Sequence, residues 1–198
     1  MGVKLINVSK SFDSDIKIKN LSYEFPEKGV VAITGDSGVG KTTLARMICG
    51  LDEDFHGEII GGGIGKCAVA FQEYRLFPQL TALDNVIFSR YDKKRRDLIE
   101  HASELLIKLG LNQDALHLRP SQLSGGMKQR VSLARALFSS APIIILDEAT
   151  KELDISLKER VISIISEEAE KRLVILVTHD PEEIKKLDAD VLHLTKLS

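Results

Sequence analysis

The chain has 198 residues, of which 43% are hydrophobic and 28% charged, and this composition is typical of a single folded domain rather than a disordered chain. The 27 basic and 29 acidic residues give a net charge of −2, which argues against binding nucleic acid through a broad basic field. Even the apolar run Leu173–Val177 is far shorter than the ~20 residues of a membrane-spanning helix. Composition therefore predicts a soluble, intracellular, unanchored protein.

Several segments have the patterns of strands and helices in an α/β fold. Residues 16–25 alternate apolar and polar side chains, which predicts a strand with one face on a core. The continuous apolar runs 30–34, 143–146 and 173–177 predict strands buried on both faces, as in a parallel sheet. After Asp154, apolar residues repeat at three and four positions and predict an amphipathic helix. We expect a mainly parallel central sheet and an N-terminal antiparallel β region.

The middle of the chain, from about residue 73 to 141, has no strand-like run. Its patterns predict one helix from about Lys93 to Leu109 and another from about Gly125 to Phe138. We therefore expect a single domain, 1–198, in which residues 1–72 and 142–198 form the catalytic core. Residues 73–141 are expected to form an inserted all-helical subdomain.

Glycines and cysteines between these elements have simple interpretations. Gly61–Gly63 lie between two short strand-like pieces and predict a hairpin turn, because no helix follows them directly. Cys49 and Cys67 belong to no paired-cysteine motif, and we expect two buried thiols.

The predicted strand 30–34 leads into a glycine-rich loop, Gly35-Asp36-Ser37-Gly38-Val39-Gly40-Lys41-Thr42-Thr43, which is followed by a helix. This segment matches the phosphate-binding loop motif at every fixed position. Its glycines let backbone N–H groups point at phosphate oxygens, and the helix N-terminus adds partial positive charge. Lys41 is expected to reach the β- and γ-phosphates, and the Thr42 hydroxyl to ligate Mg²⁺. The motif predicts a P-loop NTPase.

Two adjacent carboxylates, Asp147 and Glu148, end the predicted strand 143–146. Asp147 can hold Mg²⁺ through its water shell, and Glu148 can polarise a water for in-line attack on the γ-phosphate. A helix-capping acid is the alternative, and the phosphate loop in the same chain favours the nucleotide role. Many kinases and GTPases have a similar pair.

The segment Leu123-Ser124-Gly125-Gly126-Met127-Lys128-Gln129-Arg130 opens a predicted helix and offers a second anion-binding N-terminus. An N-capped helix without a ligand is the alternative. With the two motifs above, this segment resembles the LSGGQ-like signature of ATP-binding subunits of ABC transporters, with Met127 where Gln is frequent. The resemblance implies that Ser124, Gly125 and Gly126 grip the γ-phosphate held by another subunit in a head-to-tail dimer.

Other motifs of that family follow in the right order. Gln72 is similar to the Q-loop glutamine, which contacts Mg²⁺ and the attacking water, and His179 to the switch histidine, which contacts the γ-phosphate and orients Glu148. Phe12 stands where the family places an aromatic ring that stacks on adenine. The resemblance therefore implies that Glu148, His179, Gln72 and Lys41 are catalytic.

The segment Ala149–Asp154 corresponds to the D-loop of the family, which is normally Ser-Ala-Leu-Asp. Leu153 and Asp154 match, whereas Lys151 and Glu152 depart from that pattern. This departure leaves open how the D-loop communicates across the dimer.

The segment after the Q-loop, Glu73–Val86, is similar to that of importer-type subunits, in which this surface receives the coupling helix of a membrane subunit. The resemblance implies ATP and Mg²⁺ as cofactors, integral membrane permease subunits as partners, and an ATP-dependent homodimer or heterodimer. It places the protein in the cytoplasm, peripheral on the inner face of the cell membrane, with no nucleic-acid partner. The basic run Lys93–Arg96 is interpreted as a solvated helix start.

The predicted function is Mg²⁺-dependent ATP hydrolysis that powers solute transport through separate permease subunits. One alternative is a soluble ABC ATPase that acts on DNA or ribosomes, but such chains carry a coiled coil or tandem ATPase domains. Another is a small nucleoside or nucleotide kinase, which does not explain the segment 123–129 or His179. The cargo and the direction of transport stay open.

Overall fold

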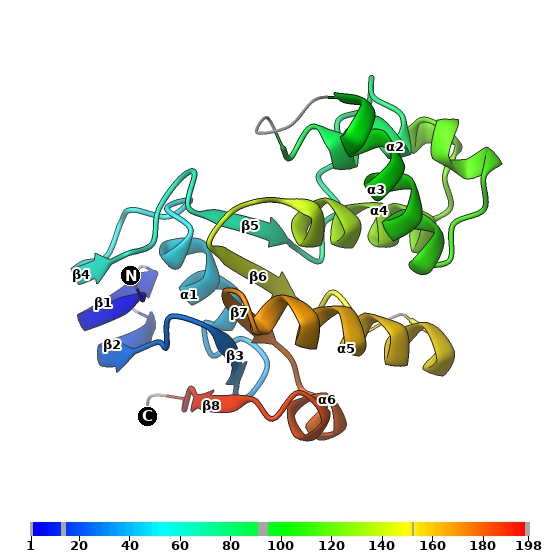
Figure 1. Cartoon of the computed structure of the whole chain (residues 1–198). Coiled ribbons are helices and arrows are strands. Elements are labelled where there is room, and N and C mark those ends of the chain that lie inside the picture. Colours follow the sequence, from blue (N-terminus) through cyan, green and yellow to red (C-terminus); the bar gives the residue numbers. More distant parts are fainter. Residues whose placement is uncertain (1, 13–14, 91–94, 152, 197–198) are drawn as a thin grey trace.

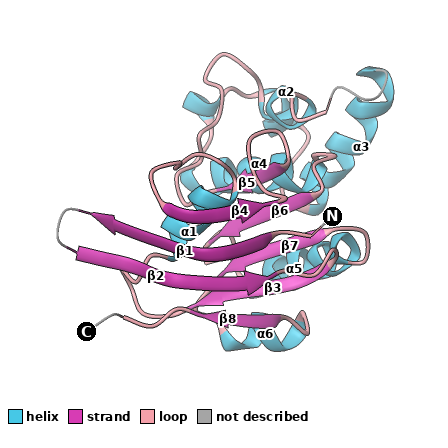
Figure 2. Cartoon of the chain, turned by 90° about the vertical axis from the view of Figure 1, so that its left-hand side faces the viewer, coloured by secondary structure: helices cyan, strands magenta, loops and turns pink. Residues whose placement is uncertain are grey.

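The computed structural model describes residues 2–12, 15–90, 95–151 and 153–196. Its centre is a five-stranded sheet with the order β5-β6-β7-β3-β8, in which all neighbouring strands are parallel. Figures 1 and 2 show this sheet with helices around it and a second sheet beside it. The five strands are β3 (Gly29–Thr34), β5 (Cys67–Ala70), β6 (Ile143–Asp147), β7 (Leu173–Val177) and β8 (Asp190–His193).

The second sheet is antiparallel, with the order β2-β1-β4, as the N-terminal sequence pattern predicts. Its strands are β1 (Lys4–Phe12), β2 (Asp15–Glu24) and β4 (His56–Ile60). The helices are α1 (Lys41–Ile48), α2 (Ala82–Ile87), α3 (Arg95–Lys108), α4 (Gly125–Phe138), α5 (Ile155–Ala169) and α6 (Pro181–Lys186), with two 3₁₀ turns, η1 (Asp114–His117) and η2 (Pro120–Gln122).

The three inner strands of the central sheet, β6, β7 and β3, are buried on both faces. Every residue of β6 and β7 is buried, which confirms the interpretation of their continuous apolar runs. Side chains alternate along β6: Ile144 and Leu146 belong to a core shared with α2 to α5, whereas Ile143 and Ile145 belong to a core shared with α1 and the antiparallel sheet. The parallel sheet is therefore the middle layer between a helical side and a mixed side.

The described residues between β5 and β6 form helices and 3₁₀ turns and no strand. Helix α4 has the predicted bounds, and α3 lies inside the predicted range 93–109. Figure 1 shows α2 and α3 gathered with α4 away from β1 and β2. Within the part of the chain that the structure describes, no helix is both long and apolar enough to cross a membrane.

The predicted hairpin at Gly61–Gly63 is wrong. Strand β4 pairs antiparallel with β1, whereas β5 pairs parallel with β6, so the glycines connect two different sheets. The connection passes close to the end of α1, where the Gly63 N–H donates to the Ile48 carbonyl at 2.9 Å. A Cβ on Gly62 would lie 2.3 Å from that carbonyl oxygen. The glycines serve this close passage, which short-range sequence patterns do not distinguish from a turn.

Candidate functional site

The phosphate-loop segment connects the buried strand β3 to helix α1. Gly35, Gly38 and Gly40 have φ values of 135°, 77° and 109°, a region that favours glycine. Gly40 is the N-cap of α1, and no side chain caps the first turn of this helix. The helix N-terminus therefore keeps backbone N–H groups available for an anion.

Lys41, the first residue of α1, turns back over this loop. Its Nζ donates to the carbonyl oxygens of Gly35 and Asp36, each at 2.8 Å. Burial lowers the pKa of the Lys41 ammonium, and the nearby carboxylates of Glu148 and Asp147 oppose that shift. The Lys41 ammonium is thus held against the loop, close to the carboxylates of Asp147 at the end of β6 and of Glu148 just after it.

Asp147 is the last residue of β6 and is only 3% exposed. Burial raises the pKa of its carboxyl group, whereas a hydrogen bond with Thr42 and the charges of Arg46 and Lys41 lower it. The Thr42 hydroxyl and the Asp147 carboxylate therefore lie together although 105 positions separate them in the chain. Both are oxygen donors of the kind that Mg²⁺ prefers.

Glu148 follows β6 with a left-handed backbone, at φ 51°. Such a conformation is uncommon outside glycine and is stored at functional sites when the surroundings determine it. The Glu148 N–H donates to the Val177 carbonyl at 3.0 Å, which ties the end of β6 to the end of β7. One carboxylate oxygen, Oε1, lies 3.5 Å from His179 Nε2, and the other, Oε2, lies 3.0 Å from Lys151 Nζ.

Strand order explains why these groups meet. Strands β6, β7 and β3 are adjacent and parallel, so their carboxyl ends lie at the same edge of the sheet. Asp147 and Glu148 follow β6, His179 follows β7, and the phosphate loop follows β3. This edge is where ligands bind in open parallel α/β sheets.

Three further candidates, Ser124, Gly125 and Gly126, lie at the start of α4, which packs against α2 and α3. The Ser124 hydroxyl accepts from the Met127 N–H at 3.3 Å and thereby caps the helix. All three residues are exposed, and a Cβ on Gly126 would meet no atom within 4 Å. The helix start is therefore open to a ligand from outside.

Comparisons with known proteins bear on the family of this chain. A family model described as ABC transporter matches residues 18–151. The glutamine transport ATP-binding protein GlnQ of Escherichia coli (strain K12) is 34% identical over 211 aligned residues, which cover 98% of this chain and 88% of GlnQ. The Fe(3+) ions import ATP-binding protein FbpC of Rhizobium etli is 36% identical over 194 residues, which cover 89% of this chain and 54% of FbpC.

Two solved structures resemble the fold of this chain. The dimeric structure of MJ0796, a bacterial ABC transporter cassette, matches with a TM-score of 0.85 at 29% identity and covers 98% of this chain and 94% of the cassette. A dimeric post-hydrolysis state of MJ0796 bound to ADP and Pi matches with a TM-score of 0.84 at 30% identity, covering 97% and 94%.

The chain belongs to the ABC transporter family. Its fold is that of the P-loop ATPase cassettes, and ATP binding with ATP hydrolysis that drives transport is the function of this family. The alternative of an ABC ATPase that acts on DNA or ribosomes is not favoured, because the named relatives are transport proteins. The kinase alternative finds no support in these relatives.

For the other residues that the sequence analysis named, the structure shows fewer contacts or does not describe the side chain. Gln72 is exposed and follows β5 after one buried residue, Phe71. The side chain of Phe12 lies outside the described residues, as does Glu152. The basic run 93–96 is also outside, apart from the backbone at the start of α3.

Helix α4 is bonded to two loops that follow predicted motif residues, through Gln129 of the signature-like segment and through Arg135, which sequence patterns did not single out. Arg135 Nη1 donates to the Arg75 carbonyl at 2.8 Å, and its Nη2 to the Tyr74 carbonyl at 3.3 Å, just after Gln72. Gln129 Nε2 donates to the Ala149 carbonyl at 3.1 Å, directly after Glu148. The helix that opens with the signature is therefore bonded to both loops.

Proposed function

We propose that this ABC ATPase binds Mg–ATP at the shared edge of β3, β6 and β7 and hydrolyses it to drive a separate membrane permease. The observation that carries the proposal is the convergence of Lys41, Asp147, Glu148 and His179 at that edge. Burying the Lys41 ammonium and the Asp147 carboxylate costs free energy. A glycine-rich turn without a ligand has no need of these two buried charges, so their presence favours a binding site.

In this proposal the segment Gly35–Thr43 cradles the phosphates with its N–H groups, and Lys41 exchanges its two loop carbonyls for phosphate oxygens. The γ-phosphate then lies between Lys41 and the end of β6. Glu148 accepts the proton of the attacking water, and His179 holds the carboxylate of Glu148 and contacts the γ-phosphate. Phe12 would stack on the adenine ring.

The donors near the β6 edge fit a magnesium ion. Thr42 offers a hydroxyl and Asp147 a carboxylate, and the two groups are close enough for Thr42 to lower the pKa of the Asp147 carboxyl, which supports a shared site. Gln72 would add an amide oxygen. Bound Mg²⁺ supplies charge neutralisation on the phosphate oxygens, and Thr42, Gln72 and Asp147 are the residues that would hold it.

A second copy, or a related ATPase subunit, would complete the site. Ser124, Gly125 and Gly126 are exposed on the helical part and form an open N-terminus on α4. In a head-to-tail dimer these residues would contact the γ-phosphate bound by the opposite chain. The dimeric arrangement of the similar cassette MJ0796 supports this dimer.

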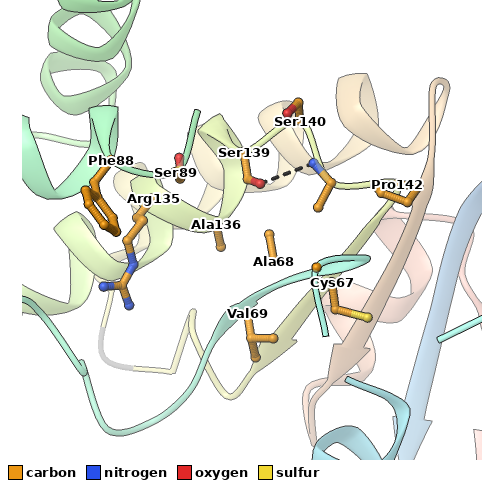
Figure 3. Close-up of a pocket in the computed structure, with 12 residues that line it drawn as sticks. Cys67, Ala68, Val69, Phe88, Ser89, Arg135, Ala136, Ser139, Ser140 and Pro142 are labelled. Carbon is orange, nitrogen blue, oxygen red and sulfur yellow. Dashed lines mark hydrogen bonds between the residues drawn. The ribbon is translucent and has the colours of Figure 1, made fainter. Parts of the chain in front are cut away.

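The permease would dock in a groove between strand β5 and helix α4, whose volume is about 800 Å³. Figure 3 shows Phe88 and Arg135 on one side of this groove and Cys67, Ala68 and Val69 on the other. Phe88 is 45% exposed and its ring packs on that of Phe77 at 4.7 Å. An apolar rim of this kind is typical of a protein-binding surface.

This docking would hold the protein at the inner face of the cell membrane. Asn85, which is fully buried, shapes the rim next to the groove: it accepts from the Phe77 N–H at 2.8 Å and donates to the carbonyls of Phe77, Leu80 and Thr81. The backbone groups that Asn85 holds lie between Gln72 and α2, so nucleotide state and permease contact would meet there. The family resemblance favours an importer, as FbpC is by its name.

The test is Glu148→Gln, with Glu170→Gln on an exposed part of the chain as the matched control. We expect steady-state ATP hydrolysis, measured without any phosphate acceptor, to fall about 100-fold or more while ATP binding persists and an ATP-bound dimer accumulates in size-exclusion chromatography. The control should hydrolyse ATP at the wild-type rate. Unchanged turnover in Glu148→Gln would exclude this residue as the base.

A further inference from the structure

Glu183 in helix α6 is a carboxylate that no family motif above includes, yet it is only 1% exposed. Its Oε1 accepts a hydrogen bond from the Thr150 hydroxyl at 2.5 Å, and its Oε2 accepts one from the Thr178 hydroxyl at 2.6 Å. Both threonines are buried as well, with exposures of 3% and 5%. A buried carboxylate is thus fully engaged by two hydroxyl groups from different segments.

The two threonines belong to the loops that carry the proposed catalytic groups. Thr150 lies two positions after Glu148, and Thr178 directly precedes His179. The Thr178 hydroxyl also accepts from the Asp180 N–H at 3.1 Å. This hydrogen bond joins the residue before His179 to the residue after it. One carboxylate therefore joins the loop after β6 to the loop after β7.

The charge of Glu183 is compensated locally. Lys158 from α5 places its Nζ 2.9 Å from Glu183 Oε1 and 2.5 Å from Asp180 Oδ2. The pKa of the Lys158 ammonium is raised: burial lowers it, but the hydrogen bonds to Asp180 and Glu183 outweigh burial. The lysine stays charged, so Glu183 can remain an acceptor for both hydroxyl groups despite its burial.

These groups surround one pocket of about 360 Å³ whose lining also includes Glu148, Lys151 and His179. Glu148 Oε1 and His179 Nε2 are 3.5 Å apart and connect the loop after β6 to the loop after β7. The buried Glu183 joins the same two loops. Glu148 and His179 are partly exposed, at 19% and 47% of their side chains, so the contact between them is not fixed by packing alone.

We propose that Glu183 is a positioning residue that sets the separation of Glu148 and His179 by clamping Thr150 and Thr178. The inference rests on the proposed function, because it gives those two residues their catalytic roles. Loss of the clamp should loosen the alignment of the base without disturbing the phosphate loop, which lies on another segment. It should therefore lower kcat and leave KM for ATP unchanged.

The test compares Glu183→Gln with Glu182→Gln, its exposed neighbour in the same helix. Glutamine keeps the shape of Glu183 but removes its charge and replaces one carboxylate oxygen by an N–H₂ group. The hydroxyl that faces this N–H₂ must turn and accept instead of donating, and the charge-assisted hydrogen bonds to the two threonines and to Lys158 are lost. We expect kcat to fall about 10-fold in Glu183→Gln with KM for ATP within about twofold of wild type. Glu182→Gln should match wild type in both constants.

A second pair of variants keeps the test decisive if Glu183→Gln does not fold. Thr150→Val removes the hydroxyl at nearly constant volume and should lower kcat about 10-fold, whereas Thr150→Ser keeps the hydroxyl and should restore the rate. Equal kcat in the folded valine and serine variants would overturn the inference, and so would a fall in kcat accompanied by an equal rise in KM.

Glu148→Gln, measured in parallel, tests the catalytic role of Glu148 separately from the positioning role of Glu183. If wild type hydrolyses ATP and Glu148→Gln does not, the proposed function stands. The variants of Thr150 and Glu183 then test only the positioning role of Glu183. If Glu148→Gln hydrolyses ATP like wild type, the assignment of the base fails independently of the clamp.

Discussion

Lys151 and Glu148 form an ion pair in which Lys151 Nζ lies 3.0 Å from Glu148 Oε2. Lys151 is one of the residues that depart from the usual D-loop pattern of the family, so this chain places a cation directly on its proposed catalytic base. The lysine side chain is 65% exposed, whereas that of the glutamate is 19% exposed. The ion pair is therefore weak and screened by solvent, but it directly involves the proposed catalytic base.

We expect Lys151→Ala to raise kcat about two- to fivefold, because removal of the ammonium leaves the carboxylate freer and a better proton acceptor. KM for ATP should stay the same. Lys151→Arg, which keeps a cation beside Glu148, is the control and should behave like wild type. Steady-state ATPase kinetics check the prediction, and a fall in kcat for the alanine variant would mean that the lysine supports the base instead.

Asn85→Ala should destabilise the fold by about 2 kcal/mol in free energy of unfolding, since it removes a fully buried amide and with it the bonds to the Phe77 N–H and the Leu80 carbonyl. Asn112→Ala, at an exposed asparagine that accepts a single N–H from Ala115, should cost less than about 1 kcal/mol. Urea denaturation measures both. Equal losses in the two variants would contradict the role given to the buried amide.

Gly62→Ala should destabilise the protein by about 2 to 4 kcal/mol, because the added methyl would meet the Ile48 carbonyl oxygen at 2.3 Å, an atom of the backbone that cannot move aside alone. Lys66→Ala, an exposed position in the same connection, should change the stability by less than about 0.5 kcal/mol. Thermal or chemical unfolding gives the comparison. A stable Gly62→Ala variant would show that the connection between the sheets can relax.

Phe88→Glu should leave the ATPase activity of the free subunit unchanged and abolish most of its stimulation by the permease, since it puts a charge on the apolar rim of the groove. Val191→Glu is the matched control: Val191 is 50% exposed but lies in β8, at the far edge of the sheet from β5. Reconstitution with the permease in vesicles measures stimulated hydrolysis. Equal stimulation of both variants would place the docking surface elsewhere.

Patterns in the sequence predicted the parts of this fold that depend on local chemistry. The apolar runs that form β6 and β7 are buried on both faces, as their sequences predict. The glycine-rich loop after β3 is recognisable in the sequence because few residues other than glycine tolerate its backbone conformation. The start of α4 at Gly125 was predictable from Ser124, whose hydroxyl caps the helix as expected.

Features that depend on distant pairing were not predictable. The short strands β4 and β5 have no local signal that assigns them to different sheets, because each finds its partner far away in the chain. Glu183 stands in an ordinary acidic helix start, and only the fold brings Thr150, from 33 positions earlier, to its carboxylate. The roles proposed for individual site residues stay predictions until the variants above are measured.

Helix α4 carries the exposed signature at one end and bonds through Arg135 and Gln129 to the segments after Gln72 and Glu148. In the proposed transport cycle, a ligand that binds at one of these places biases the others by a coupling free energy. By thermodynamic linkage, that energy is identical in both directions. The amount by which bound nucleotide alters affinity for the permease must equal the amount by which the permease alters affinity for nucleotide, so either half of the cycle can be measured to know the other.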